Sequence, residues 1–491
     1  MTDDENCGVM AQEIELKLEL TRDAANAIAV SDVLANAPKI SQQCSIYFDT
    51  PESRLAKAGL SLRIRESGGK RVQTIKSDRG NAAGLFTRTE RERTVQDDTP
   101  VLDDATLISP VLQDCADLIA PVFEVQIERR TWTLNEHDAE IELVLDRGEV
   151  IAGERRSPIC ELELELKHGP PTALFAIARR LAAVAPVRIG VLTKAERGYR
   201  LAGPVMKAVT AAPILISNEM SSAQAFQHIV QSCLRHFRLN EPLICGDDRA
   251  AALHQARVAL RRLGSAFAVF KADIDHRGAG LADEVRWLAS ELGDARNLDV
   301  LIERTKPGSL QDQLAAARNR AYDRVAVILA LPRARLLFLD LTEWVTTGGG
   351  LSATGNGAAN DRPLQECAEA ALTRFRRKVS RRKHLANATD ETRHEIRKTA
   401  KKLRYTAEFF AALFKTPRQS RRYKRFLAAL ETLQDRLGAL NDLATAKSML
   451  ETLCLAGNRH AAKVSGKGRR KRLLRLAAVA HKDWVGTKQF W

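Results

Sequence analysis

Polar and apolar side chains alternate with a period of two along several stretches of the first two hundred residues. Such alternation is typical of β-strands, because successive side chains point to opposite faces of a sheet. Segments such as Asp146–Gly148 and Gly169–Pro171 separate these stretches and predict turns. Helical periodicity appears at 24–35 and 172–184. We therefore predict an α+β or barrel-like domain over residues 1–205. The clearest alternating stretches are 13–18, 62–65, 140–143 and 161–167.

The rest of the chain has the 3.6-residue period of amphipathic helices, and strand signals are nearly absent there. A segment at 206–218 contains small residues and proline, which predicts a linker. A glycine-rich segment at 348–360 predicts a second flexible connection inside the helical part. We therefore predict an all-α domain over residues 219–491. Its clearest apolar stripes are Leu260, Leu263, Phe267 and Phe270, and Ile396, Leu403, Ala407 and Phe410.

The helical part repeats itself. His254–Phe267 reads HQARVALRRLGSAF, and His394–Ala407, 140 residues later, reads HEIRKTAKKLRYTA. A second pair of matching segments follows in the same order, with LGDARNL at Leu292–Leu298 and LGALNDL at Leu437–Leu443. Two matches in one order indicate a duplicated supersecondary unit. We therefore predict two related helical bundles, over about 219–347 and 361–491.

Charge divides the chain at the same place as periodicity. Residues 1–214 hold 27 Lys and Arg against 33 Asp and Glu, a net of −6, and residues 215–491 hold 49 against 28, a net of +21. The strongly basic part favours a polyanionic partner. No apolar run is long enough for a membrane helix, and the eight cysteines form no CxxC pair. We therefore expect a cytoplasmic protein with reduced thiols and no membrane association.

Acidic and basic side chains share one face of the predicted strands. One explanation is a solvated face of an antiparallel sheet. The other is a barrel with a charged lumen, whose apolar faces lie outward under helices. Crowded carboxylates in a lumen need cations, and crowded guanidinium and ammonium groups need anions. A polyphosphate chelated by Mg²⁺ or Mn²⁺ satisfies both sets.

These strands resemble the CYTH domains, also called triphosphate tunnel metalloenzymes. Glu13–Lys17 matches the ExExK signature that opens such domains. The later matches follow the order of the bacterial inorganic triphosphatase subgroup across residues 11–203. The resemblance implies an eight-stranded antiparallel β-barrel that hydrolyses tripolyphosphate to pyrophosphate and phosphate with a divalent metal. The matches are YFDT at 47–50, AGLSLRIR at 58–65, QTIKS at 73–77, GLFTRTE at 84–90, ERRTW at 128–132, EIELVLDRGEVIAGE at 140–154, PICELELELKHG at 158–169 and TKAERGY at 193–199.

The resemblance also implies roles for individual residues. Lys17 matches the signature lysine, which contacts phosphate and assists water activation, so the catalytic set is Glu13, Glu15 and Lys17. Glu90 matches a further acid of the family. The interpretation from the residues alone makes Asp146 a turn residue and Tyr47 a packing residue. The implied metal ligands are Glu13, Glu15, Glu142, Glu161 and Glu163, and the implied phosphate-binding residues are Arg63, Arg65, Lys76, Arg129, Lys194 and Arg197.

The repeated helices place three cations on one face. In each repeat the spacing His-x-x-Arg-x-x-x-[Arg/Lys] puts the three side chains within about 60° of one another around the helix. These segments resemble the CHAD domain, an α-helical module that often follows CYTH, across about residues 219–490. The family implies binding of inorganic polyphosphate, and association with polyphosphate granules. The expected polyphosphate-binding residues are His254, Arg257, Arg261, His394, Arg397 and Lys401.

Other functions stay open at this stage. In one alternative, the barrel is an enzyme that hydrolyses another triphosphate, such as thiamine triphosphate or a nucleotide. In the other, it is an inactive tunnel in a polyphosphate-binding scaffold. The basic run Lys467–Arg472 predicts a mobile tail that attracts any phosphate polymer, so nucleic acid is a second candidate ligand for the helical part. Aromatic residues make up only 5% of the chain, which disfavours base stacking.

Overall fold

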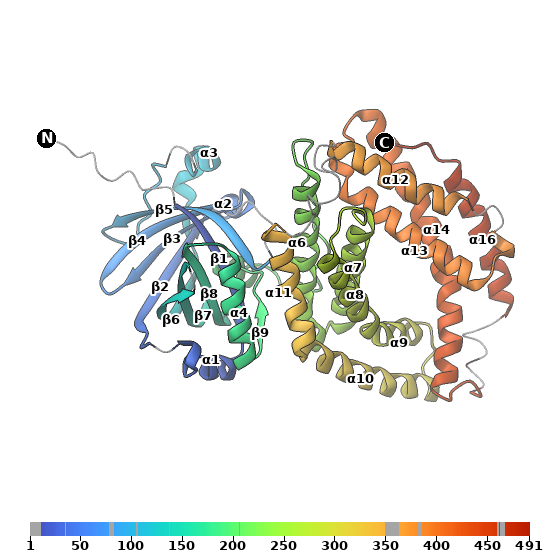
Figure 1. The fold of residues 1–491 in the computed structure, drawn as a ribbon, viewed down its shortest axis with the longest axis horizontal. Coiled ribbons are helices and arrows are strands. Elements are labelled where there is room, and N and C mark those ends of the chain that lie inside the picture. Colours follow the sequence, from blue (N-terminus) through green and yellow to red (C-terminus); the bar gives the residue numbers. More distant parts are fainter. Residues whose placement is uncertain are drawn as a thin grey trace. The chain divides into compact units, whose positions relative to one another are not determined.

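The structure is a computed structural model that describes residues 11–34, 36–77, 83–104, 107–136, 138–205, 207–348, 363–381, 385–458, 461 and 467–491. The chain divides into two compact units (Figure 1). The first unit comprises Met1–Lys207 together with Pro332–Thr347, and the second comprises Ala208–Leu331 and Gly348–Trp491. Helix α11 (Pro332–Thr346), which the sequence places at the end of the first helical bundle, therefore groups with the strands. None of the described helices is long and apolar enough to cross a membrane.

Eight antiparallel strands of the first unit close into a barrel, which confirms the predicted fold. Their order is β5-β4-β3-β2-β6-β7-β8-β1, and β1 pairs with β5 to complete the ring. A short ninth strand also pairs with β1. The strands are β1 (Ala11–Leu20), β2 (Lys39–Asp49), β3 (Leu60–Ser67), β4 (Lys70–Ser77), β5 (Leu85–Val95), β6 (Ala120–Glu136), β7 (Ala139–Ala152), β8 (Arg155–His168) and β9 (Val187–Ile189).

Helices cover apolar side chains on the outer face of the barrel, whereas Phe123 and Val125 lie on the same side of β6 as Arg129 and pack with residues of α5. Leu162 and Leu164 of β8 are fully buried, and α1 (Arg22–Ala29) and α4 (Thr172–Val184) pack against this strand. A second apolar cluster, which includes Leu62, lies with the short helices α2 (Arg54–Lys57) and α3 (Ser109–Leu112). The period-two pattern therefore leaves the charged faces for the lumen.

Strand β7 runs straight through the predicted turn at Asp146–Gly148, so that prediction is wrong. Gly148 pairs with Ile127 of β6, and a Cβ on Gly148 would lie 1.9 Å from the carbonyl oxygen of Gln126. The glycine therefore permits a close approach of two strands. Asp146 is consequently a fully buried strand residue that faces Arg129 and Glu161 on the neighbouring strands.

Helix α5 (Lys194–Ala202) packs against β6, β7 and β8. A capping box begins it, in which Thr193 and Glu196 exchange side-chain and backbone hydrogen bonds. A Cβ on Gly198 would lie 2.0 Å from the ring of Phe123, so only glycine lets the helix lie this close to β6. The position of α5 brings Lys194 into the lumen.

The second unit is helical, and both predicted apolar stripes are buried. The two repeats meet at equivalent positions, since the rings of Phe270 and Phe410 lie 6.3 Å apart and α7 packs against α13. The basic run that begins at Lys467 is the start of α16, so the prediction of a tail there is wrong. The helices are α6 (Ser222–Asn240), α7 (Arg249–Val269), α8 (His276–Glu291), α9 (Gly293–Glu303), α10 (Ser309–Ala330), α12 (Leu364–Ser380), α13 (Asp390–Phe409), α14 (Pro417–Thr452) and α16 (Lys467–Val485).

Candidate active site and anion-binding groove

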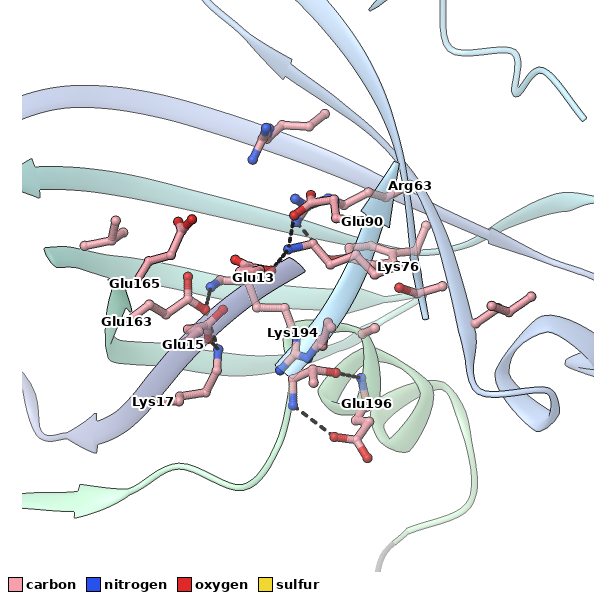
Figure 2. A pocket seen from close by; sticks show the side chains of 18 of the residues that line it. Glu13, Glu15, Lys17, Arg63, Lys76, Glu90, Glu163, Glu165, Lys194 and Glu196 are labelled. Atoms are coloured by element: carbon pink, nitrogen blue, oxygen red, sulfur yellow. Dashed lines mark hydrogen bonds and ion pairs between the residues drawn. The ribbon is translucent and has the colours of Figure 1, made fainter. Parts of the chain in front are cut away.

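The barrel lumen holds a cavity of about 610 Å³ that is lined mostly by charged side chains. Figure 2 shows these side chains converging from several strands and from α5. Eight carboxylates and nine cationic groups line the cavity, so its walls are nearly neutral when all are ionised. The carboxylates belong to Glu13, Glu15, Glu90, Glu92, Glu142, Glu163, Glu165 and Glu196, and the cations to Lys17, Arg63, Arg65, Lys76, Arg88, Arg129, Lys167, Lys194 and Arg200.

Strand register explains why opposite charges meet in the lumen. Lys17 of β1 lies directly opposite Glu163 of β8, and Lys76 of β4 lies opposite Glu90 of β5. Directly opposite side chains on neighbouring strands are close enough to interact. Because charged residues alternate along each strand, the observed register is sufficient to place opposite charges next to each other around the lumen.

Two lysines lie at the most buried end of this arrangement. Lys17 Nζ lies 3.1 Å from Glu161 Oε1 and also contacts Glu163, and Lys194 Nζ lies 2.7 Å from each of these glutamates. Burial alone would raise the pKa of Glu161, but the two lysines lower it to about 2. Burial would lower the pKa of both lysines, yet the surrounding carboxylates raise it. Both lysines are therefore cations at neutral pH.

The arginines of the wall differ in how far they are already neutralised. Arg129 makes two hydrogen bonds to Asp146, at 2.8 and 2.6 Å. Arg65 lies 3.2 Å from Glu92. Arg63 donates to the hydroxyl of Tyr47 at 3.4 Å, and its buried Nε meets no acceptor among the described residues. Arg63 therefore retains unused donor capacity toward an anion in the cavity.

The acidic residues offer a cluster that suits a divalent cation. Carboxylate oxygens of Asp146, Glu161 and Glu163 lie within 4.8 Å of one another. Oε1 of Glu15 and Oε2 of Glu161 are buried and accept no hydrogen bond among the described residues. Burial and the neighbouring Glu163 raise the pKa of Glu15, and Lys17 and Arg88 oppose this rise only in part. Hard oxygen ligands of this kind fit Mg²⁺ or Mn²⁺.

Of the twelve barrel residues given a catalytic, metal-binding or phosphate-binding role in the sequence, ten line the cavity, as does Glu90. The other two, Glu161 and Arg197, lie behind it, where Arg197 Nη2 is 2.5 Å from Glu19 and 3.7 Å from Glu161. Glu142 lies 3.6 Å from Lys167, outside the three-carboxylate cluster. Sequence reasoning missed Arg88, Glu92, Asp146, Glu165 and Lys167, although all five follow the period-two pattern of their strands.

A second charged region lies in the helical unit, where α7 and α13 bring the two repeats together. The cations of this basic groove lie close enough to repel one another. Arg261 and Arg397 lower the pKa of Lys401, whereas the carboxylate of Asp442 raises it. Burial and these neighbours lower the pKa of Lys401 to about 6. We use the name basic groove for the set of residues that influence one another in this way, which comprises His254, Arg257, Arg261, Arg296, Arg397 and Lys401.

Three arginines of the basic groove have unused donor capacity in the part of the chain that the structure describes. The Nε atoms of Arg257, Arg261 and Arg397 are buried and meet no acceptor among the described residues. Arg257 donates to the carbonyl of Leu292, and a Cβ on Gly293 would lie 3.3 Å from its guanidinium. The repeated Leu-Gly motif thus makes room for an arginine.

His254 contributes less positive charge than the spacing suggests. Burial and the neighbouring arginines lower the pKa of His254 to about 4, so this ring is neutral at physiological pH in the free protein. His394 is exposed and hydrogen-bonds through Nδ1 to Asn441 at 2.7 Å. Arg296, which the sequence did not single out, is the largest charged influence on His254.

Comparisons with known proteins identify both units. The CYTH domain model matches residues 11–199, and the CHAD domain model matches residues 228–451. An inorganic triphosphatase from Haemophilus influenzae is 31% identical over 198 residues, which cover 39% of this chain and 56% of that protein. The chain thus spans little more than half the length of this curated relative.

Two solved structures are also similar to this chain. The CHAD domain from the plant Ricinus communis is 25% identical with a TM-score of 0.45, over 56% of this chain and 96% of that one. A proposed adenylyl cyclase from Hippeastrum, described as having a dominant triphosphatase activity, is 21% identical with a TM-score of 0.30, over 37% of this chain and 92% of that one. From the two domain matches, the chain contains a CYTH domain over residues 11–199, followed by a CHAD domain over residues 228–451.

Proposed function

We propose that the barrel hydrolyses inorganic tripolyphosphate to pyrophosphate and phosphate, and that the basic groove of the helical unit binds inorganic polyphosphate. The observation that carries the first part is the near-equal mixture of carboxylates and cations around one cavity in a closed barrel. A pure anion-binding site gains nothing from eight carboxylates, because each one repels the ligand. The relative from Haemophilus influenzae supports the choice of substrate class.

Charge balance makes the activity depend on a divalent metal. Tripolyphosphate carries roughly five negative charges when fully ionised, since each terminal phosphate bears up to two and the internal one bears one. The nine cations of the wall are already matched by eight carboxylates. Two divalent cations would bring the sum close to zero. We assign them to Glu13, Glu15, Glu142, Glu161 and Glu163, with Asp146 as an additional ligand.

Side chains of the barrel would position the tripolyphosphate. Several cations line the cavity, so phosphate oxygens can meet more than one of them: Arg63, Arg65, Lys76, Arg129 and Lys194. Lys17 contacts the acids and stays protonated, so it stabilises charge and does not act as a base. A bound Mg²⁺ or Mn²⁺ would neutralise phosphate charge and lower the pKa of a bound water. Phosphoryl transfer requires mostly this positioning and charge stabilisation.

The second part of the proposal rests on the crowding of like charges in the basic groove. Arginines that crowd one another with buried, unused donors destabilise the empty protein, and an anion relieves both the repulsion and the missing hydrogen bonds. The repeat of the arrangement on α7 and α13 favours an extended polymer over a single phosphate. A phosphate polymer without bases also fits the scarcity of aromatic residues.

A phosphate-release assay tests the enzyme against its alternatives. The full chain is incubated with tripolyphosphate, ATP, thiamine triphosphate and long-chain polyphosphate, each with Mg²⁺, with Mn²⁺ and with excess EDTA. We expect the highest kcat/KM for tripolyphosphate and no turnover in EDTA. Preference for ATP or thiamine triphosphate would change the substrate. Absence of turnover with every substrate, while polyphosphate still binds, would favour the scaffold with an inactive tunnel.

A further inference from the structure

Helix α11 lies within the sequence matched by the CHAD model, yet it packs on the barrel. It contacts β9 and α4 (Figure 1). Arg179 of α4 reaches two of its acids, with Nη2 lying 2.6 Å from Asp340 Oδ1 and 2.8 Å from Glu343 Oε2. Leu341 and Trp344 of α11 are fully buried. The helix is therefore a fixed component of the first unit.

The backbone of Lys17 is held between two glycine-containing segments. Its N–H donates to the carbonyl of Gly84 at 2.8 Å, and its own carbonyl accepts from the N–H of Gly190 at 2.8 Å. A Cβ on Gly190 would lie 2.7 Å from Cγ of Lys17, so the lysine stem passes directly over this glycine. Gly84 has φ of +95°, and a Cβ there would lie 2.5 Å from Ile189. The two segments thus enclose Lys17 and touch each other.

Helix α11 contacts both of these segments. It packs against β9, whose last residue Ile189 immediately precedes Gly190. Thr342 Oγ1 also lies 3.1 Å from the carbonyl oxygen of Ala83, the fully buried neighbour of Gly84. The same hydroxyl lies 2.8 Å from the carbonyl of Phe338 in its own helix. One helix therefore supports both sides of the lysine's backbone.

We propose that α11 is a positioning element for hydrolysis in the barrel, which fixes the backbone on either side of Lys17 through Thr342 and β9. This inference rests on the proposed function, in which Lys17 contacts Glu161 and Glu163, two of the assigned metal ligands. Thr342 is a positioning residue, since it reaches the site only through Ala83 and Gly84. A segment of the CHAD sequence thereby becomes part of the catalytic unit.

The test compares three full-length variants. Thr342→Val removes the hydroxyl and keeps the side chain's shape, and Thr342→Ser restores the hydroxyl. Thr346→Val is the matched control, because among the described residues the hydroxyl of Thr346 bonds to carbonyls of its own helix alone, those of Thr342 and Glu343. The readouts are kcat and KM for tripolyphosphate with Mg²⁺, and hydrogen exchange of the Lys17 and Gly190 amides. Circular dichroism verifies the fold.

We expect Thr342→Val to lower kcat by about tenfold with little change in KM, because small displacements at a reacting centre cost rate. The Lys17 amide should exchange faster, Thr342→Ser should restore both values, and Thr346→Val should behave like the wild type. Unchanged kcat and exchange in a folded Thr342→Val protein would overturn the inference, as would equal losses in Thr346→Val. If Thr342→Val does not fold, Arg179→Gln offers a milder perturbation with the same expected direction.

The two readouts separate this inference from the function on which it rests. If the wild type hydrolyses no triphosphate, the proposed function fails, while hydrogen exchange still reports whether α11 holds Lys17. If the wild type is active and only the exchange of Lys17 is insensitive to Thr342, the positioning inference fails by itself.

Discussion

The basic groove should bind polyphosphate with the uptake of a proton by Lys401. In the free protein, burial together with Arg261, Arg397 and Arg257 lowers the pKa of this lysine to about 6, against the opposing effect of Asp442. A bound polyanion supplies the missing negative charge and raises the pKa again. The bound state then holds more protons than the free state, so affinity must fall as pH rises above about 6.

The size of the effect follows from the same value. If the pKa of Lys401 in the complex lies above 8, the free protein must take up almost one proton at pH 8 but only half a proton at pH 6. The linkage ratio is then (1 + 10²)/(1 + 10⁰), so affinity should fall by about 50-fold between pH 6 and pH 8, or about 2.3 kcal/mol. His254, with a pKa near 4 in the free protein, adds proton uptake mainly toward the acidic end.

Isothermal titration calorimetry with long-chain polyphosphate, in buffers of different ionisation enthalpy, counts the protons directly. Lys401→Arg keeps a cation that stays protonated throughout this range, so its affinity should be nearly independent of pH from 6.5 to 8. Lys398→Arg is the matched control, because this exposed lysine of the same helix pairs with Glu395. An unchanged pH dependence in Lys401→Arg, or its absence in the wild type, would refute the reasoning.

Three further predictions concern the lumen and the groove. Glu161→Gln should lower kcat for tripolyphosphate by at least about 100-fold, because it removes the charge that pairs with Lys17 and Lys194, whereas Glu149→Gln outside the lumen should retain wild-type rates; equal rates in both variants would contradict the assignment. Gly198→Ala should reduce both kcat and the melting temperature, since a Cβ there would lie 2.0 Å from an aromatic ring, and an unaltered variant would show that α5 can shift without consequence. Arg257→Glu combined with Arg397→Glu should abolish polyphosphate retention in filter binding and leave tripolyphosphate hydrolysis intact; undiminished retention by the folded variant would place the site elsewhere.

The face on which each barrel residue lies could be predicted from the sequence, because alternation with period two fixes it. The prediction that the sheet closes into a barrel rested on the order of the CYTH motifs, because the alternation alone also fits an open sheet. Asp146 was missed because Gly148 resembles a turn residue in sequence, while in the structure this glycine permits close contact with Gln126. The structural role of a glycine depends on the residues that surround it in space, and the local sequence pattern does not contain this information.

The interactions between distant segments could not be predicted from the sequence. Lys17 and Lys194 are 177 residues apart, and only closure of the barrel and the docking of α5 bring them to the same carboxylates. A histidine ordinarily gains its positive charge near pH 6.5, so the histidines of the helical repeats would be the first candidates for a pH response. In the structure, burial and nearby arginines lower the pKa of Lys401 to about 6 and that of His254 to about 4. The group that titrates close to neutral pH is therefore Lys401.

The discontinuous course of the first unit has a consequence for the newborn chain. The barrel sequence ends at Lys207, but the segment that completes this unit ends only at Thr347, which is 140 residues later. At a synthesis rate of about 5–20 residues per second, the ribosome needs roughly 7–28 s to supply this helix. During that interval β9 and α4 have already been synthesised, whereas α11, which packs against both, has not. Nascent barrels should therefore bind holdase chaperones until α11 is released, and slowing translation between residues 208 and 347 should lengthen that association.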